Sequence, residues 1–425
     1  MRKRVVITGL GVVAPNGVGV PDFTEAIKNG VSGIQHDPEL ERLDFSCQIS
    51  GKPTIPDELT LNYFTPLELR NFNASGILYG VIAGMEAWKN AGLTIETNDI
   101  PDWKSGTIFG TGTSGIEKFR ESIYKIDDLQ TRRLGSTAVA QTMNSGVSAY
   151  LGGKLGLGNQ VSTNSSACTT GAESILMGFE RIQSGLAQRM LVGSTSDSGP
   201  YIWGGFDAMK VCTFKHNQNP EQGSRPMSAS ASGFVPSSGA GALVIEDLET
   251  ALERGATIYG EILGGNCNSG GQRGQGSMTA PNGIAVQKCI TDALLNAGIT
   301  ASDLDTINGH LTATAKDAFE IENWCQALNL KGKDFPYINS LKSMVGHCLS
   351  AAGSIECVAS VLELHHDFIF PNSNCEDVHP DILKWIAVSQ IPQRLIHKKM
   401  QYIAKASFGF GDVNACIIFK KWNSI

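Results

Sequence analysis

Cys168 lies in a segment that could make a cysteine reactive. The run from Val161 to Ser174 begins with β-favouring residues, passes through small residues and ends in a helical pattern. We therefore expect Cys168 on a tight turn at the start of a helix, where the helix dipole stabilises a thiolate and lowers the pKa of the thiol. The small neighbours would let a substrate approach the sulfur. The alternative is a buried, inert cysteine, which is the more common state of this residue.

Two histidines occupy comparable positions elsewhere in the chain. The run from Thr306 to His310 is typical of a strand that ends at a histidine, and a loop rich in Thr and Ala follows it. His347 lies among small residues where the pattern predicts the start of a second buried helix. One histidine in such a place is usually a core residue. Two of them, together with a cysteine at a helix start, favour a shared catalytic site.

A fourth segment, 406–415, places Gly-flanked aromatic residues between two strand-like runs. Such a turn can present backbone N–H groups to a reacting atom. The alternative is an ordinary turn between strands.

Short β-rich runs alternate with helical patterns, which favours an α/β fold with layered sheets. The predicted strands are 5–8, 106–109, 189–192, 242–246, 258–262, 306–310, 402–406 and 415–420. The predicted helices are 174–184, 248–254 and 285–297, the last of them closed by Gly298. A boundary near Gly255 divides the chain into an N-terminal half, 1–255, and a C-terminal half, 256–425. The first contains Cys168 and the second both histidines.

Composition excludes several classes of function. The 425 residues carry a formal charge of -7, so a global basic field for nucleic acid is absent. No apolar run approaches the roughly 18 residues of a membrane helix, and the apolar run after the basic N-terminus is too short for an export signal. We therefore expect a cytoplasmic protein whose ten cysteines are reduced thiols. No cysteine pair has the C-x-x-C spacing of a zinc or redox site.

Two glycine-rich stretches resemble nucleotide loops but lack the rest of that motif. The stretch 9–14 ends the first predicted strand and runs into Pro15-Asn16-Gly17, which is typical of a turn. The stretch 110–115 leads toward a possible helix, but no following strand ends in an acidic residue. We interpret both as sites of close backbone packing, which disfavours a nucleotide-dependent oxidoreductase.

The four segments together resemble the β-ketoacyl-acyl-carrier-protein synthases, especially the type called synthase II. The resemblance covers nearly the whole chain, from the opening run 5–11 through the run 233–241 to 408–411. Its most specific part is three motifs in this order: Ala167-Cys168; Asn308-Gly309-His310 with Thr312 and Thr314; and 342–347, which ends at His347.

The resemblance implies a thiolase-like fold, with two similar halves in a layered α-β-α-β-α core, usually as a homodimer. It implies a 3-oxoacyl-[acyl-carrier-protein] synthase, active in fatty acid, polyketide or aryl-polyene elongation. In such an enzyme Cys168 accepts an acyl group from an acyl carrier protein. His310 and His347 then assist decarboxylation of malonyl-carrier protein and stabilise the enolate that attacks the Cys168 thioester.

Further roles follow from the same resemblance. Lys342 is a supporting residue, and the N–H groups of Cys168 and Phe408 form the oxyanion hole. Phe408 also gates the acyl pocket, and Thr312 and Thr314 contact the substrate. No organic cofactor is implied.

The sequence departs from the family pattern at several expected pocket positions. Leu311 replaces the usual Gly after the histidine, and Asp412 replaces the second Gly of the last motif. The loop 227–232 has almost no charge, and Thr113 stands where a bulky aliphatic residue often limits chain length. We therefore expect an acyl substrate other than an ordinary saturated chain, such as a polar, aryl or polyunsaturated one.

A further departure concerns a monovalent cation that many relatives hold. The matching ligands here are Asn308, Glu356 and Asn414, but Lys405 stands where a small polar residue is usual. We hypothesise that the Lys405 ammonium replaces the cation, with Glu356 supplying the opposite charge. The alternative is that Lys405 points to solvent and the three residues bind a metal ion.

Carrier proteins are acidic, so docking requires local basic residues. Arg132, Arg133, Lys210 and Lys215 lie in segments where relatives have docking bases, although ordinary surface charge explains each of them alone nearly as well. One alternative function is a non-catalytic chain-length partner subunit, which would lack the cysteine. Another is a thiolase that uses coenzyme A, which would have a second reactive cysteine in place of one histidine. The choice between a homodimer and a heterodimer with a related subunit stays open.

Overall fold

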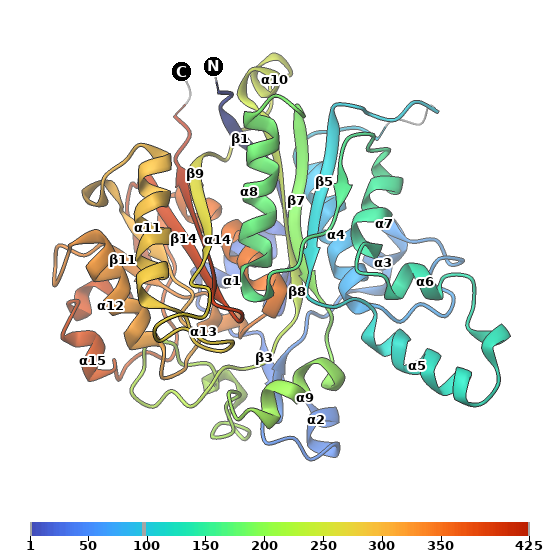
Figure 1. Ribbon diagram of the computed structural model, residues 1–425, viewed down its shortest axis with the longest axis horizontal. Helices are drawn as coiled ribbons and strands as arrows, with labels where there is room; N and C mark the ends of the chain where they lie inside the picture. Colours follow the sequence, from blue (N-terminus) through green and yellow to red (C-terminus); the bar gives the residue numbers. More distant parts are fainter. Residues whose placement is uncertain (1, 96–98, 424–425) are drawn as a thin grey trace.

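The computed structural model describes residues 2–95 and 99–423. The strands of its main sheet follow the order β11-β10-β14-β15-β9-β1-β8-β7-β5-β6, and β2 (Gly17–Val18) pairs with β1 (Figure 1). The strands of the N-terminal half are β1 (Val5–Ala14), β5 (Ser105–Thr111), β6 (Val161–Ser162), β7 (Arg189–Ser196) and β8 (Gly239–Asp247). Those of the C-terminal half are β9 (Gly260–Ser269), β10 (Thr306–Asn308), β11 (Tyr337–Asn339), β14 (Tyr402–Gly409) and β15 (Val413–Lys420).

The two halves repeat the same topology. In the first half, β5 is parallel to β6 and β7, and β7, β8 and β1 are successively antiparallel. In the second half, β10 is parallel to β11 and β14, and β14, β15 and β9 are successively antiparallel. The antiparallel pair β1–β9 joins them, with Val5 opposite Ile262. The predicted thiolase-like fold of two similar halves is confirmed.

Two helices form the middle layer of this fold. α8 (Thr170–Gln183) and α14 (Ala352–His366) contact each other and strands of both halves (Figure 1). Glycines let them approach, because a Cβ on Gly171 would lie 2.2 Å from the backbone nitrogen of Ser354. Every residue of α14 from Ala352 to Leu364 is buried, as expected for a helix covered on all sides.

The outer layers cover the other faces of the sheet. α4 (Ser75–Asn90) and α7 (Gly146–Leu155) pack on strands of the N-terminal half, and α11 (Gly283–Ala297) packs on β9 and β15 with α12 (Asp317–Leu328) beside it. Smaller elements complete the chain: α1 (Val20–Lys28), β3 (Ile34–His36), α2 (Pro38–Arg42), β4 (Ile49–Gly51), α3 (Asp57–Tyr63), α5 (Ile116–Asp127), α6 (Ala138–Thr142), α9 (Pro200–Ala208), α10 (Leu248–Glu253), α13 (Lys342–Val345), β12 (Phe368–Ile369), α15 (Pro380–Leu383) and β13 (Ile396–His397).

The predicted end of the first strand is wrong. β1 runs through both glycines and continues to Ala14. The glycines are needed for close packing inside the strand, because a Cβ on Gly9 would lie 2.2 Å from the carbonyl oxygen of Ala87 and one on Gly11 would lie 2.0 Å from that of Ala83. The interpretation of this stretch as a site of close backbone packing, here against α4, is confirmed. Among the described residues, no helix is long and apolar enough to cross a membrane.

Candidate active site

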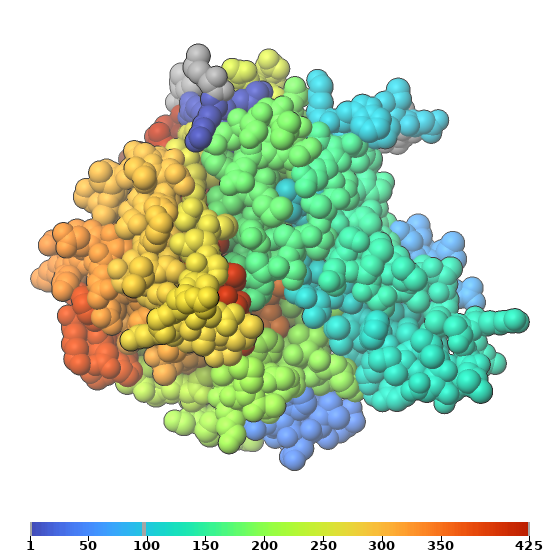
Figure 2. Space-filling view, viewed as in Figure 1, coloured from blue at the N-terminus to red at the C-terminus, as the bar shows by residue number. Residues whose placement is uncertain are grey.

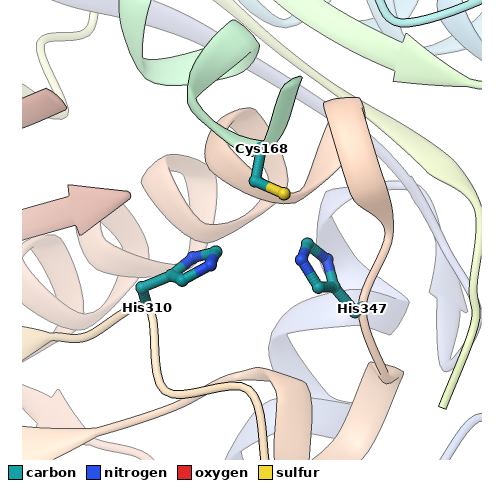
Figure 3. Close-up of side chains that lie close together, drawn as sticks. All are labelled: Cys168, His310 and His347. Atoms are coloured by element: carbon teal, nitrogen blue, oxygen red, sulfur yellow. The ribbon is translucent and has the colours of Figure 1, made fainter. Parts of the chain in front are cut away.

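Cys168, His310 and His347 converge on one site although the sequence separates them widely. The sulfur and one nitrogen of each ring lie within 4.8 Å of one another (Figure 3). The two imidazole rings are 5.4 Å apart between centroids and nearly perpendicular. Both histidines are buried, and Cys168 is partly exposed to the cavity. The three elements that carry them are the turn before α8, the loop after β10 and the segment before α14.

Cys168 sits on a short 3-10 turn, η2 (Ala167–Thr169), that leads directly into α8. Ala167 has a φ of 50°, a left-handed conformation that is costly for a residue with a Cβ. The predicted tight turn at a helix start is therefore present. The predicted low pKa of the thiol is not found. Burial raises this pKa to about 11, although Lys342 and a backbone N–H of Phe410 act in the opposite direction. Loss of water around the sulfur outweighs the local favourable charges.

The hydrogen bond of His347 fixes where its ring carries a proton. The N–H of Leu349 donates to Nδ1 of His347 over 3.1 Å. A neutral imidazole has one donor and one acceptor nitrogen, so Nε2 holds the proton. Burial lowers the pKa of His347 well below its usual range, and the positive charges of Lys342 and Lys405 lower it further. The neutral ring is therefore a hydrogen-bond donor through Nε2.

Two buried carboxylates hold the loop that presents His310. Glu320 accepts the backbone N–H groups of His310 and Leu311, each over 2.7 Å. Asp317 accepts N–H groups from Thr312, Ala313 and Met227. The loop needs this support because Leu311 and Ala313 have φ values of 20° and 62°. Burial raises the pKa of Glu320 to about 7. Sequence reasoning missed both acids, and the only available signal was their place in the first turn of the following helix.

The His310 ring is itself held in a dry environment. Burial lowers its pKa well below the usual range, and the neighbouring Lys342 and His347 add to this effect. Its Nδ1 is buried without a hydrogen-bond partner. The edge of Phe408 approaches the ring, with centroids 6.2 Å apart.

The backbone N–H that reaches Cys168 belongs to Phe410, two residues beyond the predicted Phe408. The N–H groups of Phe410 and of Cys168 itself both act to lower the pKa of the thiol. Phe408 lies inside β14, opposite Asn414 of β15, and its side chain lines the cavity. Gly409 lets the loop approach, since a Cβ there would lie 3.1 Å from the Cys168 nitrogen. The geometry thus favours Phe410 over Phe408 as the second donor of an oxyanion hole.

Asp412 ties the Phe410 loop to the neighbouring segment 270–282. Its buried carboxylate accepts the N–H of Gln272 over 3.0 Å and that of Asn282 over 2.8 Å. Gly270 and Gly276 make room for it, because a Cβ on either would lie within 2.4 Å of a carboxylate oxygen. Thr279 of this segment lines the cavity. Sequence reasoning noticed Asp412 only as a departure and missed this contact.

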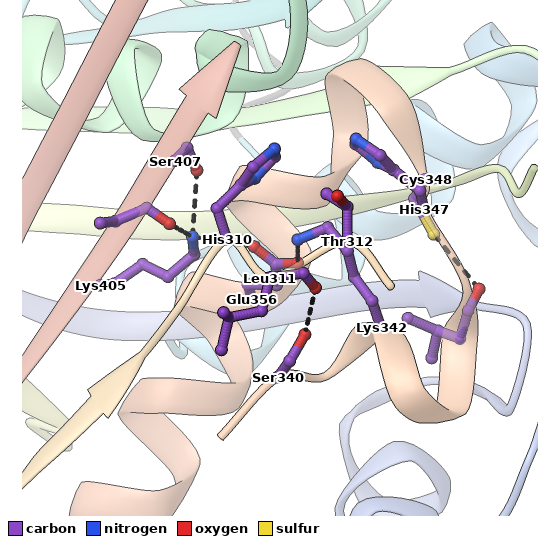
Figure 4. A network of polar contacts seen from close by, with 12 residues as sticks. His310, Leu311, Thr312, Ser340, Lys342, His347, Cys348, Glu356, Lys405 and Ser407 are labelled. Carbon is purple, nitrogen blue, oxygen red and sulfur yellow. Dashed lines mark hydrogen bonds and ion pairs between the residues drawn. The ribbon is translucent and has the colours of Figure 1, made fainter. Parts of the chain in front are cut away.

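Beneath the histidines lies a buried cluster of charges. Lys342 forms an ion pair with Oε1 of Glu356, and Nζ of Lys405 lies 2.8 Å from Oε2 (Figure 4). Their side chains are at most 2% exposed. Lys405 therefore does not point to solvent, and Lys342 occupies a supporting position below the two rings.

A cavity of about 560 Å³ opens onto the three reactive residues. The predicted residues that line it are Cys168, Lys210, His310, Thr312, Thr314, His347 and Phe408. Four predicted residues outside the cavity wall are exposed: Thr113, Arg132, Arg133 and Lys215. The other predicted residues outside it are buried: Asn308, Lys342, Glu356, Lys405 and Asn414. Lys316 and the aromatic residues Phe206, Phe234, Phe319 and Phe410 also line it, and sequence reasoning missed these contacts. In Figure 2 a small red area, from the end of the chain, is visible between the yellow and green surfaces.

Comparisons with known proteins agree with this geometry. Residues 2–251 match the family "Beta-ketoacyl synthase, N-terminal domain" and residues 259–376 match "Beta-ketoacyl synthase, C-terminal domain". The chain is 31% identical to 3-oxoacyl-[acyl-carrier-protein] synthase 1 of Haemophilus influenzae, over 99% of this chain and 100% of that protein. It is also 31% identical to 3-oxoacyl-[acyl-carrier-protein] synthase 2 of Vibrio harveyi, over 99% of each.

Solved structures show the same similarity. One is a type II polyketide synthase acyl-carrier protein in complex with its ketosynthase, with a TM-score of 0.86, 28% identity and coverage of 99% of this chain and 100% of that one. Another is a β-ketoacyl synthase from Burkholderia phymatum, with a TM-score of 0.88, 26% identity and the same coverage. With both family domains matched and relatives above 30% identity over the whole chain, this protein belongs to the β-ketoacyl synthase family.

Proposed function

We propose that this chain is a 3-oxoacyl-[acyl-carrier-protein] synthase in which Cys168 is the nucleophile and His310 and His347 serve the condensation. The observation that carries the proposal is the convergence of one sulfur and two ring nitrogens within 4.8 Å at a buried cavity. In the first step the Cys168 sulfur attacks the acyl thioester of the carrier. A new S–C bond forms, the carrier sulfur leaves, and it takes up the proton lost by Cys168.

The second step joins the two acyl units. Malonyl-carrier protein loses CO₂, and the electron pair of the broken C–C bond forms an enolate on the thioester. The N–H of His347 Nε2 and a donor nitrogen of His310 hold the enolate oxygen. The enolate carbon then attacks the carbonyl of the Cys168 thioester, which gives a 3-oxoacyl-carrier product and frees the sulfur. The N–H groups of Cys168 and Phe410 stabilise the oxyanion in each acyl transfer.

Neutral histidines suit this chemistry. The hydrogen bond from Leu349 to Nδ1 leaves the donor nitrogen of His347 available to the substrate. Burial and Lys342 keep both rings uncharged at neutral pH. A charged imidazolium would instead be poorly solvated in this pocket.

The rival assignments fit the site less well. A non-catalytic chain-length subunit would lack the nucleophile, whereas Cys168 faces both histidines here. A thiolase would place a second cysteine at the sulfur, whereas the third member of this cluster is His347. Acylation distinguishes the synthase from the non-catalytic subunit: after incubation with an acyl-carrier substrate, intact-mass measurement should show one acyl adduct on the wild type. Cys168→Ser should remain unmodified by this assay, and the exposed-cysteine control Cys267→Ser should be acylated normally.

We further propose that the acyl substrate is aryl or polyunsaturated. The cavity wall is rich in aromatic rings, and Phe206 lies 5.6 Å from Phe234 and 5.9 Å from Phe410 between centroids. Flat conjugated groups pack well on such surfaces. Thr113 lends no support, because it does not line the cavity. The test compares turnover of saturated, polyene and aryl acyl-carrier substrates of equal length. Equal or faster use of the saturated chain would refute the proposal.

The partner that fits the cavity mouth is an acidic carrier protein. Lys210 and Lys316 are exposed residues of the cavity wall, and Lys215 is exposed nearby in sequence. Arg132 and Arg133 lie on a separate 3-10 turn, η1 (Thr131–Arg133), and their docking role stays a prediction. The double change Lys210→Glu and Lys215→Glu should raise KM for carrier substrates and spare small thioester mimics. Equal loss for both substrates would exclude docking as the cause. We place the protein in the cytoplasm, which is consistent with its ten free cysteines.

A further inference from the structure

One carboxylate and two ammonium groups share a buried site below the catalytic residues. Lys405 on β14 is fully buried, and its Nζ lies 2.8 Å from Oε2 of Glu356 on α14. The other carboxylate oxygen is ion-paired with Lys342 (Figure 4). Two buried lysines and one buried acid leave an excess positive charge, so the arrangement is costly unless each charge has partners.

The ammonium of Lys405 contacts three oxygen atoms of the protein. It contacts the carboxylate of Glu356, donates to Oγ of Ser407 over 3.0 Å and donates to the carbonyl oxygen of Ala406. An ammonium carries three N–H donors. Two of its contacts, with Ala406 and Ser407, are hydrogen bonds, and the third, with Oε2 of Glu356, is an ion pair.

Two buried asparagines, Asn308 and Asn414, have side-chain oxygens without a hydrogen-bond partner. The strand register places Asn308 of β10 directly beside Lys405 of β14. Asn308 is buried, and neither polar atom of its side chain has a hydrogen bond. Oδ1 of the buried Asn414 also has none, while its Nδ2 donates to Asn268. Unpaired buried amides of this kind usually mark a site that evolved around a polar group or an ion.

These residues do not fit a metal ion in this chain. In the resembling enzymes, Asn308, Glu356 and Asn414 would correspond to the ligands of a monovalent cation. Here both oxygens of Glu356 already face ammonium groups. A metal ion at this carboxylate would add a third positive charge beside the two lysines, and like charges in a buried site repel strongly.

We infer that Nζ of Lys405 takes the place of a monovalent metal ion in this enzyme, so that its fold and its activity need none. A tethered amine cannot leave the site, so Lys405 stays in place below His310 and His347. Lys405 acts through these neighbours, which makes it a positioning residue. The inference depends on the ion pair of Glu356 and is independent of which acyl chain the enzyme uses.

The first test measures thermal midpoints in KCl, NaCl, RbCl and choline chloride at equal ionic strength. If the folded protein binds a small cation, its thermal midpoint rises as the concentration of that cation increases. The wild type should show the same midpoint in all four salts. Lys405→Ser, which restores a small polar residue, should gain more than about 3 °C in KCl or NaCl relative to choline chloride. The control Lys398→Ser removes an ammonium that is ion-paired with Asp305 and should behave like the wild type.

Each outcome decides the inference. A wild-type midpoint that rises with K⁺ or Na⁺ but not with choline would overturn it, and so would a folded Lys405→Ser protein with no cation response. If Lys405→Ser does not fold, wild-type crystals soaked in RbCl provide the second test. An anomalous peak at coordination distance from Glu356 contradicts the inference, and its absence there supports it. None of these readouts uses acyl substrate, so their result is distinct from success or failure of the proposed condensation.

Discussion

The rate at which iodoacetamide alkylates Cys168 should rise steeply with pH through the neutral range. Only the thiolate reacts, and the pKa of this thiol is raised to about 11 by burial. The thiolate is then about one molecule in 10⁴ at pH 7 and about one in 100 at pH 9. We therefore expect the second-order rate constant to increase by about 100-fold between these values. A thiol activated by its helix to a pKa near 7 would instead level off over the same range.

The assay follows the mass of the intact protein over time at pH 7, 8 and 9, with Cys168→Ser as the background from the other cysteines. A second arm uses Lys342→Met, which keeps an apolar chain of similar length but removes the positive charge that lowers the pKa of Cys168. The thiol pKa should rise further, so the variant should react more slowly at every pH in the series. A plateau below pH 9 in the wild type, or unchanged alkylation in Lys342→Met, would contradict this electrostatic account of the sulfur.

Three other outcomes follow from the contacts around the site. His347→Ala should reduce decarboxylation of malonyl-carrier protein by about 10²- to 10³-fold, the usual effect of losing one oxyanion donor, and acylation of Cys168 measured by mass should persist. Asp317→Asn should lower the free energy of unfolding by about 1–3 kcal/mol, because a buried amide cannot accept all the N–H groups that this carboxylate accepts. Denaturant titration checks this value, with the exposed Asp334→Asn as the control. Asp412→Gly should speed tryptic cleavage after the exposed Arg273 by about tenfold or more, since the loss of two charge-assisted hydrogen bonds frees segment 270–282. Unchanged cleavage would show that Asp412 does not hold this segment.

The sequence was sufficient to predict which residues meet at the site. The chemistry of Cys168, His310 and His347 depends on local patterns that persist in the structure: a turn before a helix, a strand end and a run of small residues. The layered α/β fold followed from the alternation of strand and helix patterns. Local patterns also located most of the core strands to within a few residues.

What the sequence could not predict depends on distant neighbours. The thiol pKa is set by how completely the folded chain excludes water, and the helix start alone gave the wrong direction. The glycines of β1 are typical of a turn until α4 packs against them, and then they extend the strand. The roles of Asp317 and Glu320 appear only when the His310 loop folds back over the first turn of α12. The sequence assigned the second oxyanion-hole N–H to Phe408, two residues before Phe410. The end of β14, just before Phe410, depends on how this strand pairs with β15.

The duplication of the fold explains why the site forms where it does. Each middle helix is entered through a three-residue 3-10 turn that begins with a left-handed residue: Ala167 with φ 50° before α8, and Leu349 with φ 51° before α14. Cys168 is the second residue of the first turn, and the equivalent position in the second turn, η5 (Leu349–Ala351), is Ser350. Ser350 does not line the cavity and instead donates to the carbonyl oxygen of Thr195. His347, just before that turn, faces the sulfur in its place, so two similar backbone turns supply one nucleophile and one donor.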